Sequence, residues 1–531
     1  MAAVADRDCD VLVVGAGPTG LMAATLLRRR GVRVRVVEKR AEASRESQAF
    51  AIQARTLELF GSIGLVESFL DRGVMNTGVE FHLGGRPLGG LDFDRADSPD
   101  TPFPFILMLP QAETEALLIA DLEAQGVRVE RGVEVARLAQ DAAGVTVRGT
   151  GPEGEVSIRS AFLVGADGAH SIVRKALGLS FAGAPYDQHF LLADCRVDWD
   201  LGHHRFRGFV NAGALGLFLP LKGEALSRVM AADTRPEAAT GDPRAPLGLP
   251  EMQAAFSAAV GHPVRLRDAA WTSRYRIHHR GVERYRVGRA FVAGDAAHIH
   301  SPAGGQGMNT GLQDAANLAW KLAEVVQGTA GDALLDSYDA ERRPVGEAVL
   351  RQTDRLFSVV AAQRGWRAAL RGPLMTAVFG GAAELGAVQR RAFRTVSEID
   401  IAYPGASKGP HPRAGERAPD AAINRRTRVF DLITGYRPHL LALSRRPLGP
   451  EAVEAARAAM EGFRMPSHLV ARLVAGRDPR AVVPETAAVF EAYGLHGPAD
   501  QAVLVIRPDG YVAWRGEGLD LTAARRALSG R

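Results

Sequence analysis

Cysteine is almost absent from this chain: only Cys9 and Cys195 occur among 531 residues. Two thiols are too few for a disulfide scaffold or a cysteine-held metal cluster, and they suit a reducing compartment. No cysteine follows residue 195, which excludes a CxxC redox pair in the C-terminal half. Histidine is commoner, but the pairs 278–279 and 298–300 have no carboxylate or cysteine at ligand spacing, so we expect no metal site.

Long hydrophobic runs are also missing. The most apolar N-terminal stretch, 11–27, is interrupted by three glycines and a proline, and aspartates rather than basic residues precede it. That pattern fits neither a signal peptide nor a transmembrane helix, so we expect a cytoplasmic protein with no membrane partner. Aromatic residues make up only 6% and do not alternate with basic ones, which argues against nucleic-acid binding.

Lysine is scarce, since only Lys39, Lys175, Lys222, Lys321 and Lys408 accompany the arginines among 65 basic residues. The net charge is only +5. An arginine cluster at 28–35 is expected to complement the C-terminal end of a helix. The alternative is an attraction for anionic phosphates.

What is present is an ordinary globular composition, with 46% hydrophobic and 24% charged residues. The length predicts about three or four domains of roughly 150 residues. We expect helices at 21–30, 56–70, 111–125, 250–260, 312–326 and within 340–400. We expect strands at 10–14, 32–37, 127–139, 144–148, 162–165 and 289–293, further short strands at 75–104 and 185–285, and a hairpin at 502–506 and 511–514.

The first 40 residues follow a strand–helix–strand pattern around Gly15-x-Gly17-x-x-Gly20. Gly15 permits the tight turn, Gly17 lets a pyrophosphate approach the backbone, and Gly20 lets helix and strand pack closely. The N-terminus of the helix offers free N–H groups to phosphates. Glu38, at the end of the second strand, can accept hydrogen bonds from ribose hydroxyls. The pattern predicts dinucleotide binding without distinguishing NAD from FAD.

Two later segments make that distinction. One is Gly165-Ala-Asp-Gly-Ala-His-Ser-Ile-Val-Arg174, and the other runs from Gly288 through Gly294-Asp-Ala-Ala-His298 to Asn309. With the N-terminal motif, they resemble the group A flavoprotein monooxygenases, which are aromatic hydroxylases of the para-hydroxybenzoate hydroxylase type. The resemblance covers roughly residues 8–400.

This resemblance implies roles for individual residues. Asp295 matches the acid that binds a ribityl hydroxyl of FAD, and Asp167 with Gly168 matches a motif that supports FAD and nicotinamide binding. Residues 304–309 match the loop beside the isoalloxazine ring, where a helix N-terminus would stabilise negative charge on reduced flavin. The implied cofactor-binding residues are Gly15, Gly17, Thr19, Gly20, Glu38, Lys39, Arg55, Gln111, Asp167, Gly168, Arg174, Gly294, Asp295, Gly307, Met308 and Asn309. The implied catalytic positions are Pro302, which would wall the face where oxygen adds, Gly305 and Gly307.

The resemblance also implies the reaction. NADPH would reduce FAD, and oxygen would form a flavin C4a-hydroperoxide that transfers one oxygen atom to an electron-rich ring. The choice of NADPH over NADH rests on the family alone. Besides the aromatic substrate and O2, self-association is the one further partner left open.

One segment departs from the simple phenol hydroxylases of this family. They place an aspartate, which helps to deprotonate the phenol, shortly before a segment that here contains Arg55-Thr-Leu-Glu58. This chain has Ala49 and Phe50 there instead. That shifts the expectation towards polycyclic polyketide hydroxylases or antibiotic-modifying monooxygenases, with a base elsewhere left open.

The predicted fold is α/β: a Rossmann-like FAD-binding domain of the glutathione-reductase type, an antiparallel-sheet substrate domain, long helices and a C-terminal thioredoxin-like domain. Residues 415–531 resemble that last domain, with 505–514 as its final hairpin. The predicted boundaries are 1–74, 105–184 and 286–345 for FAD binding, 75–104 and 185–285 for substrate binding, 346–402 for a helical segment, 403–419 for a linker, and 420–531 for the C-terminal domain.

Two other classes of flavoenzyme lack support: a flavin halogenase would carry Trp-x-Trp-x-Ile-Pro and a two-Rossmann Baeyer–Villiger enzyme Phe-x-Gly-x-x-x-His, and neither motif occurs. Two alternatives remain. Group A enzymes can perform Baeyer–Villiger or ring-opening oxidations, and the chain could be a catalytically silent flavoprotein acting as a binding module.

Overall fold

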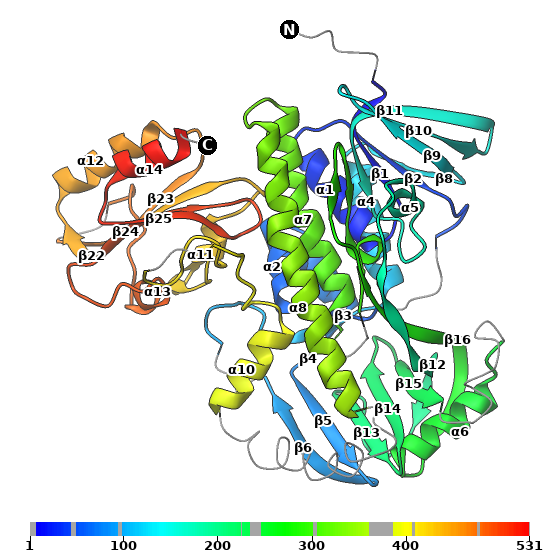
Figure 1. Cartoon of the computed structure of the whole chain (residues 1–531). Helices are drawn as coiled ribbons and strands as arrows, with labels where there is room; N and C mark the ends of the chain where they lie inside the picture. Colours follow the sequence, from blue (N-terminus) through cyan, green and yellow to red (C-terminus); the bar gives the residue numbers. More distant parts are fainter. Residues whose placement is uncertain are drawn as a thin grey trace.

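The structure is a computed structural model. It describes residues 7–43, 49–93, 98–224, 226–233, 246–300, 305–360, 386–405, 409–474 and 478–529, without the side chains of 185–188, 275–278 and 353–360. Figure 1 shows two large sheets that share a set of long helices, with a smaller lobe beside those helices. Within the described residues, no helix combines the length and apolar character needed to cross a membrane.

The first sheet is built around the predicted strand–helix–strand unit. Its main path has the order β17-β18-β11-β1-β2-β8, and the steps from β18 to β8 are parallel, while β9 and β10 extend β11 as antiparallel strands. The central strands are continuous apolar runs because both faces are covered. The bounds are β1 Cys9–Val14, β2 Val34–Glu38, β8 Val129–Arg131, β9 Glu134–Gln140, β10 Val145–Gly151, β11 Gly154–Gly165, β17 Arg286–Val287 and β18 Ala290–Val292.

Helices α1 (Pro18–Arg29), α4 (Gln111–Ala124) and α7 (Gly307–Val326) lie together, since α1 contacts both of the others. The arginine cluster holds neighbouring elements together: Arg29 pairs with Asp121 on α4 and Arg30 with Glu324 on α7, while Arg35 on β2 pairs with Glu130 on β8. These contacts account for the cluster structurally, without a phosphate.

The second sheet has the order β19-β16-β12-β15-β14-β13-β5-β6 and is antiparallel except between β13 and β5. Segments 78–92 and 182–281 therefore join in one sheet, as the sequence predicts. Helix α6 (Leu249–Val260) covers it. The bounds are β5 Gly78–Leu83, β6 Arg86–Asp92, β12 Ala182–Asp198, β13 Phe206–Asn211, β14 Ala214–Pro220, β15 Leu226–Asp233, β16 Arg265–Gly281 and β19 His298–Ile299.

Several expected boundaries are wrong. The helix expected at 56–70 is two helices, α2 (Ala54–Ser62) and α3 (Val66–Arg72), because Gly64 between them has a φ of +74°. Helix α7 begins at Gly307 rather than near residue 312. Helix α8 runs through the expected boundary at 345. Shorter or later elements are α5 Ile172–Ala176, α8 Asp336–Val360, α10 Gly386–Val396, η3 Gly294–Ala296, η4 Asp332–Leu335, β3 Ala51–Ile52, β4 Val74–Asn76 and β7 Ile106–Met108.

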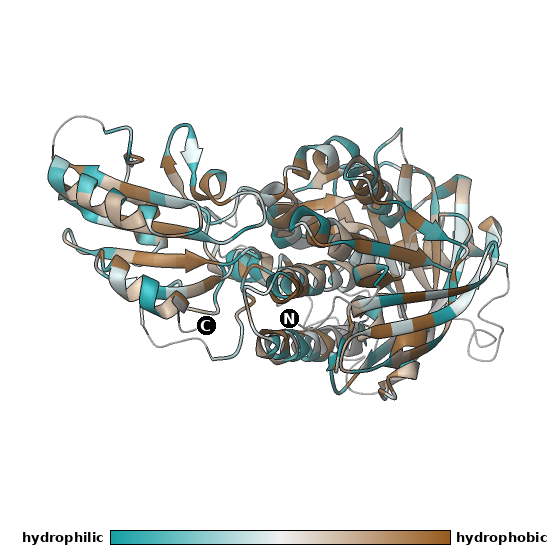
Figure 2. Cartoon of the chain, turned by 90° about the horizontal axis from the view of Figure 1, so that it is seen from above, coloured by the Kyte–Doolittle hydropathy of each residue, from teal (hydrophilic) through white to brown (hydrophobic). Residues whose placement is uncertain are grey.

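The C-terminal lobe has its own core around a four-stranded sheet of order β23-β22-β24-β25. Strands β22 and β23 are parallel, and the predicted hairpin is confirmed as antiparallel β24–β25. Figure 2 shows hydrophobic residues along the strands of both lobes. The bounds are β20 Ala422–Asn424, β21 Thr427–Arg428, α11 Val429–Leu432, β22 His439–Leu448, α12 Pro450–Glu461, β23 Ser467–Leu473, α13 Ala488–Ala492, β24 Gln501–Ile506, β25 Val512–Glu517 and α14 Leu521–Ser529.

The segment expected as the linker 403–419 is not a free connection. Tyr403 stacks on Tyr511 with ring centroids 4.1 Å apart, and Arg417 is buried against Glu58 and Asp100. In its described residues, 403–405 and 409–419, the backbone is irregular, as proline and glycine favour, and the aromatic and arginine side chains anchor it between the lobes.

Candidate functional site

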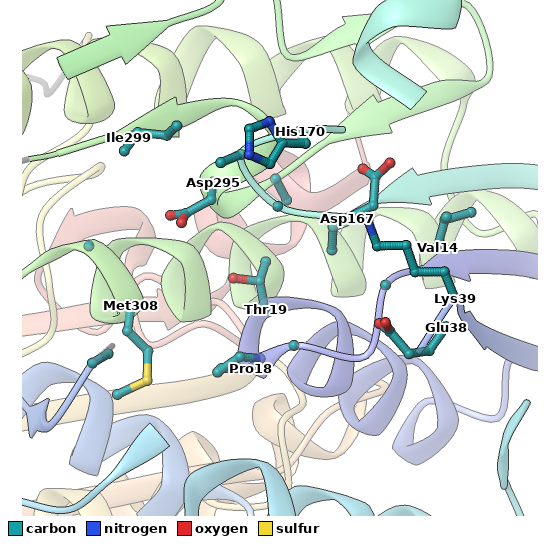
Figure 3. A pocket seen from close by; sticks show the side chains of 18 of the residues that line it. Val14, Pro18, Thr19, Glu38, Lys39, Asp167, His170, Asp295, Ile299 and Met308 are labelled. Atoms are coloured by element: carbon teal, nitrogen blue, oxygen red, sulfur yellow. The ribbon is translucent and has the colours of Figure 1, made fainter. Parts of the chain in front are cut away.

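A cleft of about 890 Å³ opens at the carboxyl ends of β1, β2, β11 and β18. This is the edge at which parallel α/β sheets bind ligands. Figure 3 shows Glu38 and Lys39 at one end of the cleft and Met308 at the other, with Pro18 and Thr19 between them. The cleft therefore runs from the N-terminal motif to the start of α7, and its volume is typical of a small-molecule site.

The three glycines of the N-terminal motif have different surroundings. Gly15 has a φ of +104°, and a Cβ there would lie 2.3 Å from the carbonyl oxygen of Ala166. A Cβ at Gly20 would lie 2.0 Å from the carbonyl oxygen of Gly15. A Cβ at Gly17 would meet no described atom within 4 Å, because Gly17 faces the cleft. Two glycines thus serve packing, and the third leaves room for a ligand at the N-terminus of α1.

Glu38 is held in place as a carboxylate. Its two oxygens accept hydrogen bonds from the backbone N–H groups of Ala16 at 2.9 Å and Arg40 at 3.0 Å. Burial works to raise the pKa of Glu38, but these hydrogen bonds and the Arg40 guanidinium outweigh it, so the pKa lies below its usual value. The carboxylate lines the cleft and can accept further hydrogen bonds there.

Asp167 organises the start of α5. Its carboxylate accepts hydrogen bonds from the Ser171 hydroxyl at 2.5 Å and from the backbone N–H groups of Ile172 at 2.7 Å and Val173 at 3.2 Å. Burial nevertheless raises its pKa. Asp167 and Gly168 both line the cleft, and Gly168 has a φ of +75°.

Arg174 supports the cleft from behind. Its guanidinium donates to the carbonyl oxygens of Ala296 at 3.0 Å and Ala169 at 2.8 Å, and it lies 3.8 Å from the centre of the Phe181 ring. It therefore ties the Asp167 segment to the turn η3. Gly294 in that turn has a φ of +58°, and a Cβ there would lie 2.5 Å from the Thr19 hydroxyl.

Asp295 is the one carboxylate that projects from η3 into the cleft (Figure 3). Desolvation by the surrounding walls raises its pKa, and His298 opposes that effect. Among the described residues, none hydrogen-bonds this carboxylate. An acceptor placed in this way is suited to the hydroxyls of a polyol chain.

The start of α7 forms the far end of the cleft, where Gly305, Gly307 and Met308 line it. Asn309 does not face the cleft. Its amide donates to the carbonyl oxygens of Ala51 at 2.8 Å and Gly305 at 2.9 Å, and its carbonyl oxygen accepts from the N–H of Gln53. Asn309 thus fixes the loop, while the predicted Pro302 lies outside the described residues.

Two further predicted contacts have different outcomes. Gln111 lines the cleft, and its amide donates to Glu115 at 2.8 Å. Arg55 does not line it: the guanidinium is buried, pairs with Glu58 at 2.9 Å and donates to the backbone carbonyl of Asp509. The sequence pattern places Arg55 next to flavin-contacting segments, but its side chain turns towards the C-terminal lobe.

Other cleft residues are absent from the sequence prediction. His170 and Lys175 lie beside predicted residues of the same segment, whereas Arg280 comes from β16 with no motif to mark it. Phe50 and His300 also line the cleft. The sequence marks Phe50 only as standing where simple phenol hydroxylases carry an aspartate, and His300 only as a histidine without partners at metal-ligand spacing. In the described part of the chain, no cluster of histidine, cysteine and acidic residues could hold a metal ion.

Comparisons with known proteins agree with this geometry. A family model described as an FAD binding domain matches residues 8–353, and one described as the C-terminal domain of aromatic-ring hydroxylases matches residues 411–531. A 12-dehydrotetracycline 5-monooxygenase/anhydrotetracycline 6-monooxygenase of Streptomyces rimosus is 36% identical over 521 residues, which are 95% of each chain. A rifampicin monooxygenase of Streptomyces venezuelae is 34% identical over 96% of each chain.

Solved structures give the same result. An anhydrotetracycline hydroxylase from Streptomyces rimosus aligns with a TM-score of 0.76 and 34% identity, covering 98% of this chain and 99% of that one. An aklavinone-11 hydroxylase in complex with FAD and aklavinone aligns with a TM-score of 0.76 and 29% identity over 98% of each chain. The motifs, the cleft and these matches show that the chain belongs to the FAD-dependent aromatic-ring hydroxylases and is a flavoprotein monooxygenase.

Proposed function

We propose that this monooxygenase uses NADPH and O2 to hydroxylate a polycyclic aromatic substrate of the polyketide type. The observation that carries the proposal is the cleft itself, whose lining combines the open space at Gly17 with the Glu38 and Asp295 carboxylates. The named relatives support the substrate class, because they act on tetracycline intermediates or on rifampicin.

The residues present fit FAD laid lengthwise in the cleft. Glu38 would accept from the adenosine ribose, the backbone at Gly17 and the N-terminus of α1 would hold the pyrophosphate, and Asp295 would bind the ribityl chain. The flavin ring would then lie beside Gly305, Gly307 and Met308. When bound, FAD supplies the redox chemistry: it takes up a hydride and activates oxygen. The N–H groups at the start of α7 would stabilise negative charge there.

The choice of a nicotinamide dinucleotide as reductant is supported by the charge of the cleft walls. His170, Lys175 and Arg280 all line the cleft, and the Nε of Arg280 has no hydrogen-bond partner among the described residues. Basic groups in a cleft attract phosphates. These residues would orient the dinucleotide during hydride transfer, and Gly305 and Gly307 would leave space for the reacting ring.

The substrate would lie next to Phe50, which replaces the acid of simple phenol hydroxylases. This segment is held firmly, because the buried Arg228 donates to the carbonyl oxygen of Ala49 at 3.2 Å. Arg228 also forms a bidentate pair with Asp194 at 2.7 Å, and its guanidinium lies 5.7 Å from the Phe50 ring. An apolar wall of this kind favours stacking of a flat polycyclic ring and exclusion of water.

We further infer the division into domains given by the sequence, with a thioredoxin-like C-terminal lobe. A parallel β22–β23 pair joined through α12, followed by the antiparallel hairpin β24–β25 and α14, supports that assignment. Without cysteine, the lobe would serve assembly rather than redox exchange.

The test is flavin content followed by cofactor oxidation. We expect yellow protein with one FAD per chain, and oxidation of NADPH faster than NADH that anhydrotetracycline, aklavinone or 1,8-dihydroxyanthraquinone stimulates. Mass spectrometry should show a product heavier by one oxygen atom, with the ring carbons intact. A ring-expanded or ring-opened product would favour the Baeyer–Villiger alternative. Bound FAD without stimulation by any ring compound would favour the silent flavoprotein.

A further inference from the structure

A chain of buried hydrogen bonds leads from α8 and α7 to the wall of the cleft. The Nε of Arg342 donates to one Asp314 oxygen at 2.8 Å, and the other oxygen lies 2.6 Å from His298 Nε2. His298 Nδ1 lies 2.7 Å from His300 Nε2. Asp314 and Arg342 are 0% exposed, His298 is 1% exposed, and His300, which lines the cleft, is 9% exposed.

The chemistry of these groups fixes where the protons lie. Burial works to raise the pKa of Asp314, but His298 and Arg342 outweigh it and keep the carboxylate ionised, so Asp314 can only accept. His298 Nε2 must therefore carry a hydrogen. If His298 is neutral, its Nδ1 is an acceptor, His300 Nε2 must donate, and His300 Nδ1 is left as a bare acceptor.

The base role requires a neutral His298 before substrate binds, and several charged or titratable groups surround this ring. Among the described residues, Arg342 is the cation in direct contact with the cluster, and it pairs with Asp314. Asp295 in η3 interacts electrostatically with His298, and burial raises the pKa of Asp295. Glu398, which contacts Thr310 and Gln313 on α7, has its pKa raised to about 8 by burial. Tyr285 stacks on His298 with centroids 5.8 Å apart and also has a raised pKa.

His300 lines the cleft near Gly307, which the proposed function places beside the flavin ring. It follows β19, the two-residue strand that pairs with β16 and joins the loop before α7 to the substrate sheet. A Cβ at Gly307 would lie 3.9 Å from the His300 ring. Among the described residues, nothing hydrogen-bonds His300 Nδ1, which is a buried acceptor without a partner. Such a site is unfavourable unless a ligand supplies the donor.

We propose that His300 Nδ1 accepts the proton of an acidic hydroxyl on the aromatic substrate, and that His298 and Asp314 are positioning residues that hold His300 in its Nε2–H tautomer. The inference rests on the proposed function. The hydroxyl O–H bond breaks and an N–H bond forms at Nδ1, while the Nε2 proton can pass to His298 Nδ1, where the Asp314 carboxylate stabilises the resulting imidazolium. The substrate is left as a phenolate, whose higher electron density favours attack by the ring carbon. This supplies the base that Ala49 and Phe50 do not provide.

The first test needs no substrate. The holoenzyme, labelled with ¹⁵N at the histidine rings, is compared with the His300→Asn holoenzyme so that the His300 signals are identified. We expect a pyridine-type Nδ1 and a pyrrole-type Nε2 at pH 7, because His300 Nε2 faces His298 Nδ1 and burial lowers the pKa of His300. Asp314→Asn should change this tautomer pattern. An imidazolium or an Nδ1–H tautomer at pH 7 would overturn the proposal, whatever the protein oxidises.

The second test measures kcat against pH with whichever of the three ring compounds stimulates the wild type most. His300→Asn keeps an acceptor near the Nδ1 position but cannot take the proton, so kcat at pH 7 should fall by about 10²-fold with KM changed less than about threefold. The loss should shrink as pH approaches the pKa of the free hydroxyl, because bulk solvent then ionises it. Asp314→Asn should show the same recovery at high pH.

His204→Asn, a substitution at an exposed histidine outside the cleft, is the control and should match the wild type. A loss in His300→Asn that does not depend on pH, or no loss, would contradict the base role. A failure of the proposed function can be told apart from a failure of the base role. In the first case the wild-type protein lacks flavin or shows no stimulated oxidation, and the ¹⁵N measurement still decides the tautomer of His300.

Discussion

At the scale of single residues, Gly17 and Asp295 are the positions where the proposed cofactor site can be tested apart from the fold. Gly17 has φ −76° and ψ 176°, an extended conformation open to any residue, and no described atom would meet its side chain. Asp295 makes no hydrogen bond to any other described residue. Changes at both positions should therefore affect the ligand before they affect stability.

Gly17→Val should give a folded protein that purifies without flavin, because the side chain occupies the space meant for the pyrophosphate. The ratio of absorbance near 450 nm to that at 280 nm reports this, and the Tm of flavin-stripped protein should change by less than about 2 °C. Gly449→Val is the matched control: Gly449 also precedes a proline at the start of a helix, with φ −79° and ψ 168°, and lies outside the cleft. Stoichiometric FAD in Gly17→Val would refute the proposed cradle.

Asp295→Ala should weaken FAD binding by about 10-fold or more, the cost of one hydrogen bond to a charged group. The Kd for FAD, measured by quenching of flavin fluorescence on titration of the flavin-stripped protein, checks this. Thermal unfolding of the same flavin-stripped protein should be unchanged. An unaltered Kd would show that the ribityl contact is elsewhere.

The sequence predicts best the residues whose backbone must adopt a particular conformation or make a particular close contact. Gly15, Gly20 and Glu38 could be assigned because a tight turn, a close helix contact and a strand end leave few choices. Arg55 could not, since its partner Asp509 lies more than 450 residues away and only the folded chain brings the two together. Phe50 and Arg280 likewise enter the cleft from segments without a motif.

At the scale of elements, the turn between β24 and β25 fastens the C-terminal lobe to the helices behind the cleft. Arg507 forms a bidentate pair with Glu341 on α8 at 2.8 and 3.0 Å and also contacts Asp509. Lys321 on α7 donates to the same Glu341 at 2.7 Å. Burial lowers the pKa of Lys321 to about 7, so Arg507 is the group of this cluster that stays positively charged at neutral pH.

Arg507→Met should destabilise the protein by roughly 3 kcal/mol or more, because it leaves buried carboxylates without their main counter-charge. Urea unfolding followed by circular dichroism measures the change. Arg72→Met, which removes an exposed ion pair with Glu113, should cost less than about 1 kcal/mol. Equal effects in the two variants would mean that the turn is not a fastening point.

Glu398 links the end of α10 to α7 and gives stability a pH dependence. Burial raises its pKa to about 8, so the folded state holds a proton that the unfolded state releases above about pH 4.5. Its stabilising contribution is complete below that pH and is lost as pH rises through about 8. Glu398→Gln should remove this fall, seen as a flatter plot of Tm against pH from 5 to 9. Parallel plots for the two proteins would contradict the assignment.

Element types were largely predictable, but their ends and their partners were not. The strand–helix–strand unit, α6 and the β24–β25 hairpin follow local patterns of apolar residues and turn signals. The start of α7 at Gly307 could not be predicted from such patterns, because the glycines suggest a loop. In the structure, the contacts of Asn309 hold the helix start there. The segment 403–419 was expected to be a linker. Composition predicts irregular backbone, but it does not predict whether that backbone is anchored by its side chains.

At the scale of the whole molecule, the cleft lies where the parallel sheet, the antiparallel sheet and α7 come together. β19 crosses from one sheet to the other directly after the Asp295 turn, so cofactor and substrate surfaces are parts of one continuous structure. No residue of the C-terminal lobe is among the described residues that line the cleft, and the lobe lies beside α7 and α8 (Figure 1), where Arg507 pairs with Glu341. This arrangement suits a reaction that must bring a reductant, oxygen and an aromatic ring to one place while excluding water.

The most direct test of this account is the source of the oxygen atom in the product. Purified enzyme with FAD, NADPH and anhydrotetracycline would be incubated under ¹⁸O2 in ordinary water, and the product analysed by mass spectrometry, with the other two ring compounds in parallel. The account predicts one ¹⁸O atom in the product, one NADPH consumed for each hydroxylation, and no label when ¹⁸O is supplied as water. A protein that takes up no FAD, or a product labelled from water, would contradict it.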